Sequence, residues 1–303
     1  MLASLPTSLT PGSPDWPAAV DALARPPRLL HLLGRMPDLS RAVAIVGTRR
    51  PDAAAEHFTR TLAGDLVRAG CPIVSGGALG IDAAAHLGAL EAGGLTVAVL
   101  AGGLARAYPA RNRPLFARIA ADGALLTEAA EGDTPHRGAF LERNRLIAAL
   151  ARVVIVVQAP FASGALSTAA HACKLGRPLL AVPHAPWQPQ GAGCLTLLAR
   201  GAGVCNGVAD VLSLSALEGG ERPLPTPPRT SPGRPVKASK YHDLDEDERR
   251  VVEALSEGSA TADGLCDLSA LPAPRVQRAI LMLLLSKVIQ EVSCGRYART
   301  DCL

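Results

Sequence analysis

The regular alternation of short aliphatic runs with longer alanine-rich segments restricts most strongly how this chain can fold. The aliphatic runs are Val43–Val46, Pro72–Ser75, Thr96–Leu100, Leu125–Thr127, Val153–Val157 and Leu179–Val182. Segments of helical length separate them, such as Ala53–Ala69, Ile81–Ala92, Arg113–Ala121 and Ala139–Leu150. Aromatic residues are only 3% of the chain, so Ala, Val and Leu must build the core. This pattern predicts an α/β fold, with a parallel sheet and helices on both of its faces.

The pattern divides the chain into four parts. Residues 1–40 are predicted to be a proline-rich lead-in segment, with a short amphipathic stretch around Leu29–Leu33, and residues 41–217 hold the alternating domain. Residues 218–240 contain six prolines and five basic residues, which is typical of a linker.

Residues 241–303 are predicted to form a small winged-helix domain. Three helix-like segments come first, followed by two short strands that a polar turn connects. They are Glu246–Glu257, Thr261–Leu268, Ala273–Leu285, Val288–Val292 and Arg296–Ala298.

Composition excludes several classes of protein. The seven cysteines include no Cys-x-x-Cys pair, so we predict neither a metal site nor a disulfide framework, and no cofactor. No apolar run approaches the ~20 residues of a membrane span, so we expect a cytoplasmic protein without membrane contact. The net charge of +4 permits nucleic-acid binding without demonstrating it. No nucleophile elbow or pair of catalytic carboxylates is evident, and we expect a protein that is not an enzyme.

Glycines follow the predicted strands at Gly47, Gly76–Gly77, Gly102–Gly103 and Gly164. In an open α/β sheet these strand ends border the crevice where ligands bind. Glycine lets a phosphate approach the backbone closely, and the start of the next helix attracts anions. The glycines therefore mark a candidate anion-binding edge.

Two motifs fit this edge. In Gly47-Thr48-Arg49, Arg49 could hold a phosphate or be an exposed residue of a tight turn, and the residues leave both open. The segment Ser75–Asp82 has small residues between a strand and a helix, which favours an anion cradle over a merely structural turn. Asp82 would lie in the first helical turn, where a carboxylate complements the helix dipole.

Two further motifs lie later in the chain. Phe140–Arg145, preceded by Arg137, places an aromatic ring among cations, as single-stranded nucleic acid requires. The residues alone favour the alternative, a core phenylalanine on a helix with a charged outer face. Ser163 and Gly164 could cap a helix or contact a phosphate or sugar.

The order and spacing of these motifs resemble the DNA-processing protein A family. The family's motifs are represented here by Gly47–Arg49, Ser75–Asp82, Tyr108-Pro109, Phe140–Arg145 and Ser163–Ala169. The resemblance implies an extended Rossmann-like fold that dimerises, binds and protects incoming single-stranded DNA, and loads the RecA recombinase in natural transformation.

Positions carried over from the family assign roles to individual residues. Arg49 and Arg137 would hold phosphates, Phe140 would stack on a base, and Arg143 and Asn144 would shape the pocket. The remaining expected DNA-binding residues are Gly47, Thr48, Ser75, Gly76, Gly77, Gly80, Ser163 and Gly164. The chain departs from the family's frequent residues at Asp52, Gln158, His184 and Gly193.

Two other functions remain open. The first is a nucleotide-processing enzyme of the phosphoribohydrolase type, although Ala101-Gly102-Gly103-Leu104 lacks the Gly-Thr that those enzymes carry. The second is a transcription regulator that acts through Ala273–Leu285 as a recognition helix. Only Arg275 and Arg278 are charged there before Lys287, which favours contact with protein at least as much as contact with DNA.

Overall fold

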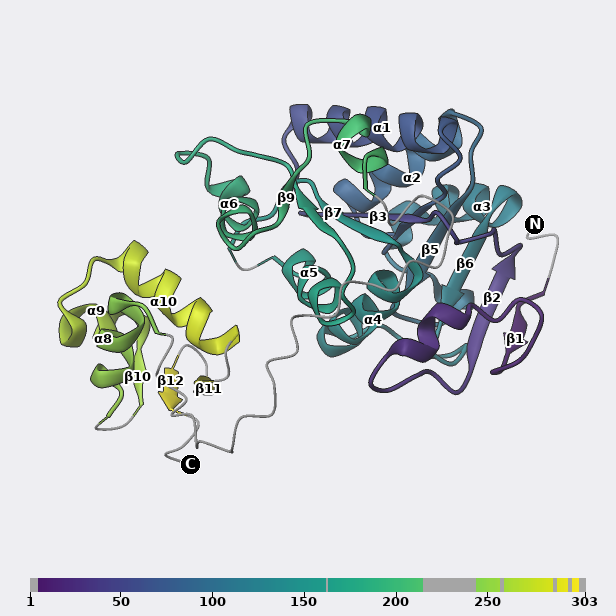
Figure 1. Cartoon of the computed structure of the whole chain (residues 1–303). Coiled ribbons are helices and arrows are strands. Elements are labelled where there is room, and N and C mark those ends of the chain that lie inside the picture. Colours follow the sequence, from purple (N-terminus) through teal and green to yellow (C-terminus); the bar gives the residue numbers. More distant parts are fainter. Residues whose placement is uncertain are drawn as a thin grey trace, which may run out of the picture. The chain divides into compact units, whose positions relative to one another are not determined.

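A computed structural model describes residues 5–161, 163–214, 244–256, 259–285, 288–293 and 296–299. The chain separates into two compact units, within Met1–Pro225 and Thr226–Leu303 (Figure 1). The predicted linker at residues 218–240 lies outside the described residues.

The first unit contains a nine-stranded sheet in the order β1-β2-β6-β5-β4-β3-β7-β8-β9. Neighbouring strands from β6 to β9 are parallel, and β2 pairs antiparallel with both β6 and β1. The strands are β1 (Thr7–Leu9), β2 (Leu30–Gly34), β3 (Val43–Val46), β4 (Ile73–Ser75), β5 (Thr96–Leu100), β6 (Ala124–Thr127), β7 (Val153–Val156), β8 (Leu179–Ala181) and β9 (Gly203–Val204). All six predicted strands form. The predicted lead-in segment adds β1 and β2, so it belongs to this sheet.

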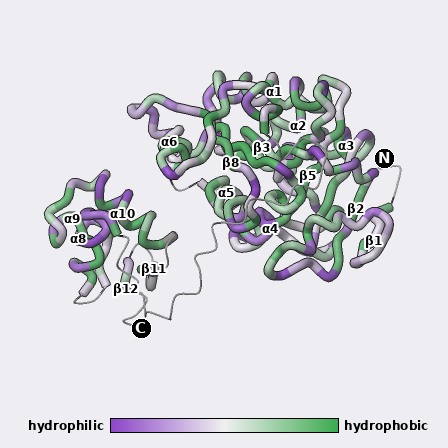
Figure 2. The backbone as a smooth tube through the Cα atoms, viewed as in Figure 1, coloured by the Kyte–Doolittle hydropathy of each residue, from purple (hydrophilic) through white to green (hydrophobic). Residues whose placement is uncertain are grey.

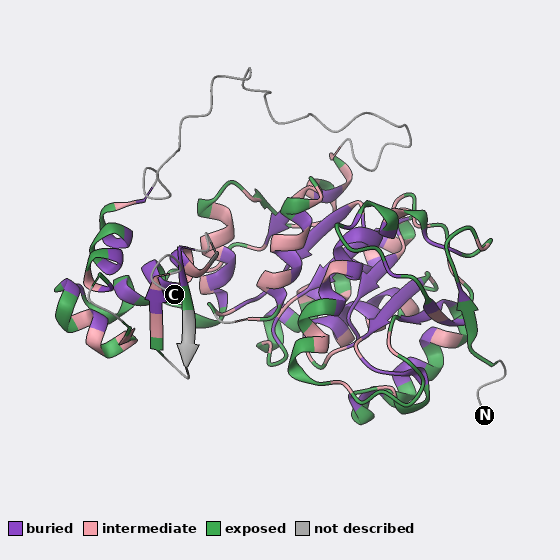
Figure 3. Ribbon diagram, turned by 90° about the horizontal axis from the view of Figure 1, so that it is seen from below, coloured by how far each residue is buried: buried purple, intermediate pink, exposed green. Residues whose placement is uncertain are grey.

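Helices cover both faces of the sheet, as predicted. One face carries α1 (Ala53–Arg68), α2 (Ile81–Glu91), α3 (Arg113–Asp122) and α7 (Val208–Leu212), and the other α4 (Arg137–Leu150), α5 (Ala165–Lys174) and α6 (Ala192–Ala199). Short 3-10 turns are η1 (Ala18–Ala22), η2 (Leu104–Arg106), η3 (Ala110–Asn112) and η4 (Pro189–Gly191). Figure 2 shows apolar residues along the central strands, and Figure 3 shows these strands buried. Both faces of β3 are buried because Val43 and Ile45 pack under one helical layer, while Ala44 and Val46 pack under the other.

The strand order reverses next to β3. From β3 the chain proceeds through β4 and β5 to β6, and then returns through α4 to place β7 on the other side of β3. In open α/β sheets, a crevice opens outside the carboxyl ends of two strands at such a reversal. The carboxyl ends of β3 and β7 therefore mark the expected binding position.

The start of α4 differs from the sequence prediction. The helix begins at Arg137, two residues before the predicted Ala139. A ring nitrogen of His136 accepts a hydrogen bond from the Ala139 backbone at 3.3 Å, and this cap allows the earlier start. Arg137 thereby lies in the first turn of the helix.

The second unit is a winged helix with its own core. Its elements are α8 (Glu246–Ala254), β10 (Ala260–Thr261), α9 (Ala262–Ser269), α10 (Ala273–Leu285), β11 (Ile289–Ser293) and β12 (Arg296–Arg299). The three helices pack around Val251, Leu265 and Val276, and the strands pair antiparallel in the order β10-β12-β11. The three predicted helices form, the two predicted strands pair antiparallel, and β10 is an additional strand. Residues 294 and 295 of the predicted turn lie outside the described residues.

The described cysteines Cys71, Cys173, Cys194, Cys205 and Cys266 are free thiols. Burial raises the pKa of both the Cys194 and the Cys205 thiols to about 12, so they stay protonated at neutral pH. Across the described ranges, we find no cluster of His, Cys, Asp and Glu arranged to hold a metal ion. In the same ranges, no helix combines the length and the apolar character that crossing a bilayer requires.

Candidate nucleic-acid interface

A cleft of about 770 Å³ lies outside the carboxyl ends of β3 and β7. Its walls come from the segment after β3, the start of α2, the first half of α4 and the loop that leads into α5. Nine of the predicted DNA-binding residues line it: Gly47, Thr48, Arg49, Arg137, Phe140, Arg143, Asn144, Ser163 and Gly164. The fold thus brings together motifs that are up to 117 positions apart, from Gly47 to Gly164.

Phe140 lies at the centre of an aromatic and cationic group. Its ring is half-buried on the cleft wall and is not part of the core of the described residues. The guanidinium carbon of Arg49 lies 4.8 Å from the ring centroid, and that of Arg143 lies 5.9 Å away. The Tyr108 ring approaches edge-on at 6.0 Å. The residue pattern alone favoured a core position, but the first turn of α4 carries Phe140 to the cleft.

Arg143 is buried behind this group. Its Nη1 donates hydrogen bonds to the backbone oxygens of Gly76, at 2.6 Å, and Val99. Burial lowers the pKa of Arg143 to about 10, although the nearby Asp82 carboxylate raises it, so the guanidinium stays charged at neutral pH. Arg143 therefore ties α4 to the ends of β4 and β5 and supplies fixed positive charge beneath the cleft.

Asp82 is a cleft residue that the sequence placed only at a helix start. It lines the cleft and is buried, and its carboxylate accepts a hydrogen bond from the Ala78 backbone at 3.3 Å. Burial raises the pKa of Asp82, while the charge of Arg143 opposes that rise. No local sequence pattern predicts that these two side chains lie close together, because they are 61 positions apart.

The glycine-rich loop supports the cleft from behind. Ser75, Gly76, Gly77 and Gly80 are not among the lining residues. A β-carbon on Gly76 would lie 2.8 Å from Nη2 of Arg143, so Gly76 leaves room for that guanidinium. Gly80 has a φ of +79°, and a β-carbon there would lie 2.4 Å from the Thr48 carbonyl oxygen. A direct phosphate contact by these four residues stays a prediction.

The sequence profile of the family described as DNA recombination-mediator protein A matches residues 7–216. The chain belongs to this family. A second profile, the DprA winged helix domain, matches residues 235–293. The family resemblance that the motifs predicted is confirmed.

Curated relatives share much of the sequence of this DNA recombination-mediator protein A family member. The putative DNA processing protein DprA of Mycobacterium tuberculosis is 41% identical over 281 residues, which cover 87% of this chain and 69% of the relative. Protein Smf of Synechocystis is 35% identical over 319 residues, which cover 97% and 80%.

Two solved structures agree with the fold. DNA processing protein A from Streptococcus pneumoniae has a TM-score of 0.65 at 35% identity, over 68% of this chain and 73% of that one. The protein from Helicobacter pylori, whose structure is described as giving insight into a single-stranded DNA binding mode, has a TM-score of 0.61 at 36% identity, over 68% and 93%.

Two of the departures from the family's frequent residues contact each other. The Gln158 amide donates to an Asp52 carboxylate oxygen at 2.6 Å, and the Gln158 side-chain oxygen accepts from the Asp52 backbone at 3.1 Å. Asp52 also caps α1 by accepting from the Ala55 backbone at 2.8 Å. The bonds from Ala55 and Gln158 lower the pKa of Asp52. Asp52 and Gln158 thus hold the start of α1 against the segment that follows β7.

Asn144 and the α5 loop close the far wall of the cleft. The Asn144 amide donates to the Gly164 carbonyl oxygen at 3.1 Å, and the Ser163 hydroxyl accepts from the Ala165 backbone at 3.3 Å. Gly164 is the N-cap of α5. Asn144 thus holds the loop against α4, and its role in shaping a DNA pocket stays a prediction.

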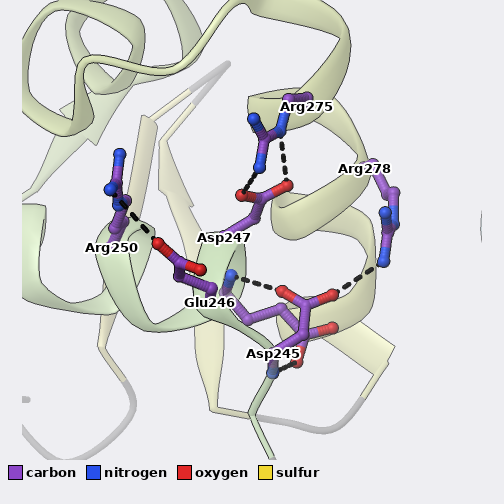
Figure 4. A network of polar contacts seen from close by, with 7 residues as sticks. Asp245, Glu246, Asp247, Arg250, Arg275 and Arg278 are labelled. Atoms are coloured by element: carbon purple, nitrogen blue, oxygen red, sulfur yellow. Dashed lines mark hydrogen bonds and ion pairs between the residues drawn. The ribbon is translucent and has the colours of Figure 1, made fainter.

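In the winged-helix unit, carboxylates at the start of α8 pair with arginines of α10 (Figure 4). On α10, the expected recognition helix, Arg275 pairs with Asp247 through bonds from Nε at 2.8 Å and from Nη2. Arg278 pairs with Asp245 at 2.7 Å. Lys287 lies outside the described residues. Both described cations of α10 are therefore held by carboxylates at the start of α8, which disfavours base reading by this helix.

Proposed function

We propose that this protein binds single-stranded DNA in the cleft outside β3 and β7, without catalysing a reaction on it. The observation that carries the proposal is the guanidinium of Arg49 at 4.8 Å from the half-buried Phe140 ring. A ring of this kind stacks on an unpaired base, and the cations beside it neutralise the adjacent phosphates. The described binding mode of the H. pylori relative supports this assignment.

Single strands fit this arrangement better than duplex does. The Phe140 ring forms part of the cleft wall, so a base must leave its own stack to reach the ring. Exposed Arg137 and Arg49 lie on the same wall. In this assignment Arg49 and Arg137 contact phosphates, while buried Arg143 fixes their supporting scaffold.

The family resemblance supports two further parts of the proposal. The first unit forms a homodimer with two DNA sites, and the bound strand passes to the RecA recombinase. Light scattering should report twice the monomer mass at micromolar concentration, and a monomer would contradict the first part. With DNA coated by single-strand-binding protein, the protein should shorten the lag before RecA hydrolyses ATP, and an unchanged lag would contradict the second.

A nucleotide-processing enzyme of the phosphoribohydrolase type fits less well. The loop after β5, which contains Gly102 and Gly103, is occupied by the chain itself. Gly103 donates its backbone N–H to the Asp133 carbonyl oxygen at 3.1 Å, and a β-carbon on Gly103 would lie 2.3 Å from the Ala130 carbonyl oxygen. The segment 130–135 therefore fills the place where such an enzyme would bind phosphate.

A mobility-shift titration tests the proposal. The protein should bind oligo-dT more tightly than duplex of equal length, and its affinity should fall as salt rises. Phe140→Ala should cost about 1–3 kcal/mol of binding with nearly unchanged salt dependence, because stacking releases few counterions. Arg49→Ala should reduce the salt slope by roughly one unit or less.

Arg68→Ala is the matched control for the arginine variant. Arg68 is exposed at the end of α1 and pairs with Asp65, so its loss should leave binding unchanged. Equal affinity of the wild type for both DNA forms would refute the proposal. If Phe140→Ala instead lowers stability by the roughly 3–5 kcal/mol of a lost core aromatic, Phe140 has no DNA role.

A further inference from the structure

The exposed aromatic side chains of the described residues all follow strands of the parallel sheet. They are Tyr108, 51% exposed, Phe161, 43% exposed, and Trp187, 83% exposed. Tyr108 comes after β5, Phe161 after β7 and Trp187 after β8. The carboxyl ends of these parallel strands lie on one edge of the sheet, which is the edge that carries the cleft.

Trp187 differs sharply from Trp16, the other tryptophan. Trp16 is buried, and its indole nitrogen donates to Asp21 at 3.0 Å. A tryptophan left almost fully in water gains nothing for folding, since burial of its ring is the stabilising contribution. Its exposure leaves the ring available for contact with another molecule.

Hydrogen bonds before and within the loop that carries Trp187 hold its backbone in place. Before it, a His184 ring nitrogen lies 2.9 Å from the Val157 carbonyl oxygen, at the end of β7. Within it, the Ala185 backbone donates to the Gln188 side chain at 3.1 Å and the Gln188 backbone donates to the Ala185 carbonyl oxygen at 2.9 Å. Three residues beyond Trp187, Gln190 lines the cleft. The turn thus presents the indole from a defined position beside the cleft.

We propose that Trp187 is an outer base-stacking residue, and that Phe161 joins it to the Phe140 pocket. The inference rests on the proposed function, because it extends the same single-stranded DNA site toward β8. Aromatic rings that follow one another beside cations are the arrangement that holds successive unpaired bases. Pro160 and Ser163, on either side of Phe161, line the cleft and connect the two ends.

The spacing of the strands that precede Tyr108, Phe161 and Trp187 indicates how much single-stranded DNA the site can hold. From β5 to β8 there are four steps between neighbouring strands, in the order β5-β4-β3-β7-β8. At about 4.8 Å a step, the strands that precede the three rings span about 19 Å. Oligo-dT long enough to cross this distance should therefore bind more tightly than a shorter oligonucleotide that reaches only Phe140.

Three variants and one spectroscopic signal test this inference. Trp187→Ala should weaken binding of oligo-dT about 5- to 150-fold, and Trp187→Phe should keep most of the affinity, because phenylalanine still stacks. Leu95→Ala is the matched control, since Leu95 is exposed and immediately precedes β5, at the opposite edge of the sheet. Oligo-dT should quench the tryptophan fluorescence of the wild type and leave that of Trp187→Phe unchanged, because the remaining Trp16 is buried.

The possible failures differ from one another. If the wild type does not bind oligo-dT, the proposed function itself fails and the inference fails with it. If Phe140→Ala weakens binding but Trp187→Ala does not, the cleft stands and the outer stacking role is wrong. If Trp187→Ala binds like the wild type but changes the mass found by light scattering, a second copy of the chain covers the indole and the inference is overturned.

Discussion

Replacing Arg143 by methionine should destabilise the first unit strongly. The variant loses two hydrogen bonds to backbone oxygens and leaves the Asp82 carboxylate buried without its nearby cation. Removing the cation that lies close to a buried carboxylate costs about 3–5 kcal/mol, the loss found when one partner of a buried pair is removed. For a unit of this size, each kcal/mol corresponds to roughly 2–4 °C, so the melting temperature should fall by about 6–20 °C.

The pH dependence of this loss identifies its cause. Burial raises the pKa of Asp82 in the folded state, so its ionisation costs stability as pH rises above the unfolded pKa of about 3.9. Arg143 reduces that cost, and its removal raises the pKa of Asp82 further. The stability difference between Arg143→Met and the wild type should therefore be largest near pH 7 and become smaller as pH falls and Asp82 takes up a proton.

Thermal unfolding, followed by circular dichroism at several pH values, measures this effect. The double variant Asp82→Asn/Arg143→Met should recover part of the loss at pH 7, because no charge is left buried. Arg68→Met, at an exposed ion pair, should melt within about 2 °C of the wild type. If Arg143→Met also melts within about 2 °C of the wild type, or if its loss of stability does not change with pH, then Arg143 does not compensate the charge of Asp82.

Two further predictions concern contacts that the structure reveals. Gln158→Glu should lower the melting temperature at neutral pH, because two carboxylates would then meet where the amide now donates at 2.6 Å. Adding Asp52→Ser should restore it, because the serine hydroxyl donates to the new glutamate; a single variant that melts like the wild type would show that this contact does not contribute to stability. Arg275→Ala/Arg278→Ala should lower the melting temperature of the winged helix without weakening binding of duplex DNA, and a marked loss of duplex binding would show that α10 contacts DNA.

The parallel part of the fold was predictable because its strands are buried on both faces. A short aliphatic run such as Val153–Val157 between two helical segments is typical of a strand that helices cover on both faces. The alternation of runs and helical segments therefore predicted which segments are strands. The edge strands were harder. In Leu30–Gly34, Leu30, Leu32 and Leu33 are buried and His31 is half-buried, but the pairing of this strand with β6 depends on partners 90 to 96 positions away.

The position of the site was predictable for a related reason. Residues that follow parallel strands meet at one edge, so Arg49 and Ser163 could be placed together without knowing any contact. Side-chain partners were not predictable in this way. Gly76 makes room for Arg143, and Arg143 lies close to Asp82. Both contacts depend on the direction in which α4 crosses the sheet, which the spacing of residues in the sequence does not predict.

Charge is divided unevenly along the chain, and this division bears on where DNA binds. Residues 241–303 carry seven Lys and Arg against eleven Asp and Glu, although the whole chain has a net charge of +4. An acidic domain repels a phosphate backbone, and ion pairs already hold the two described cations of its α10 helix. Arg49 and Arg137 lie instead in the first unit, where residues 1–225 carry 20 Lys and Arg against 16 Asp and Glu, on a scaffold that buried Arg143 holds in place. Both the charge balance and the contacts therefore favour the first unit as the DNA-binding part, and favour a protein partner for the winged helix.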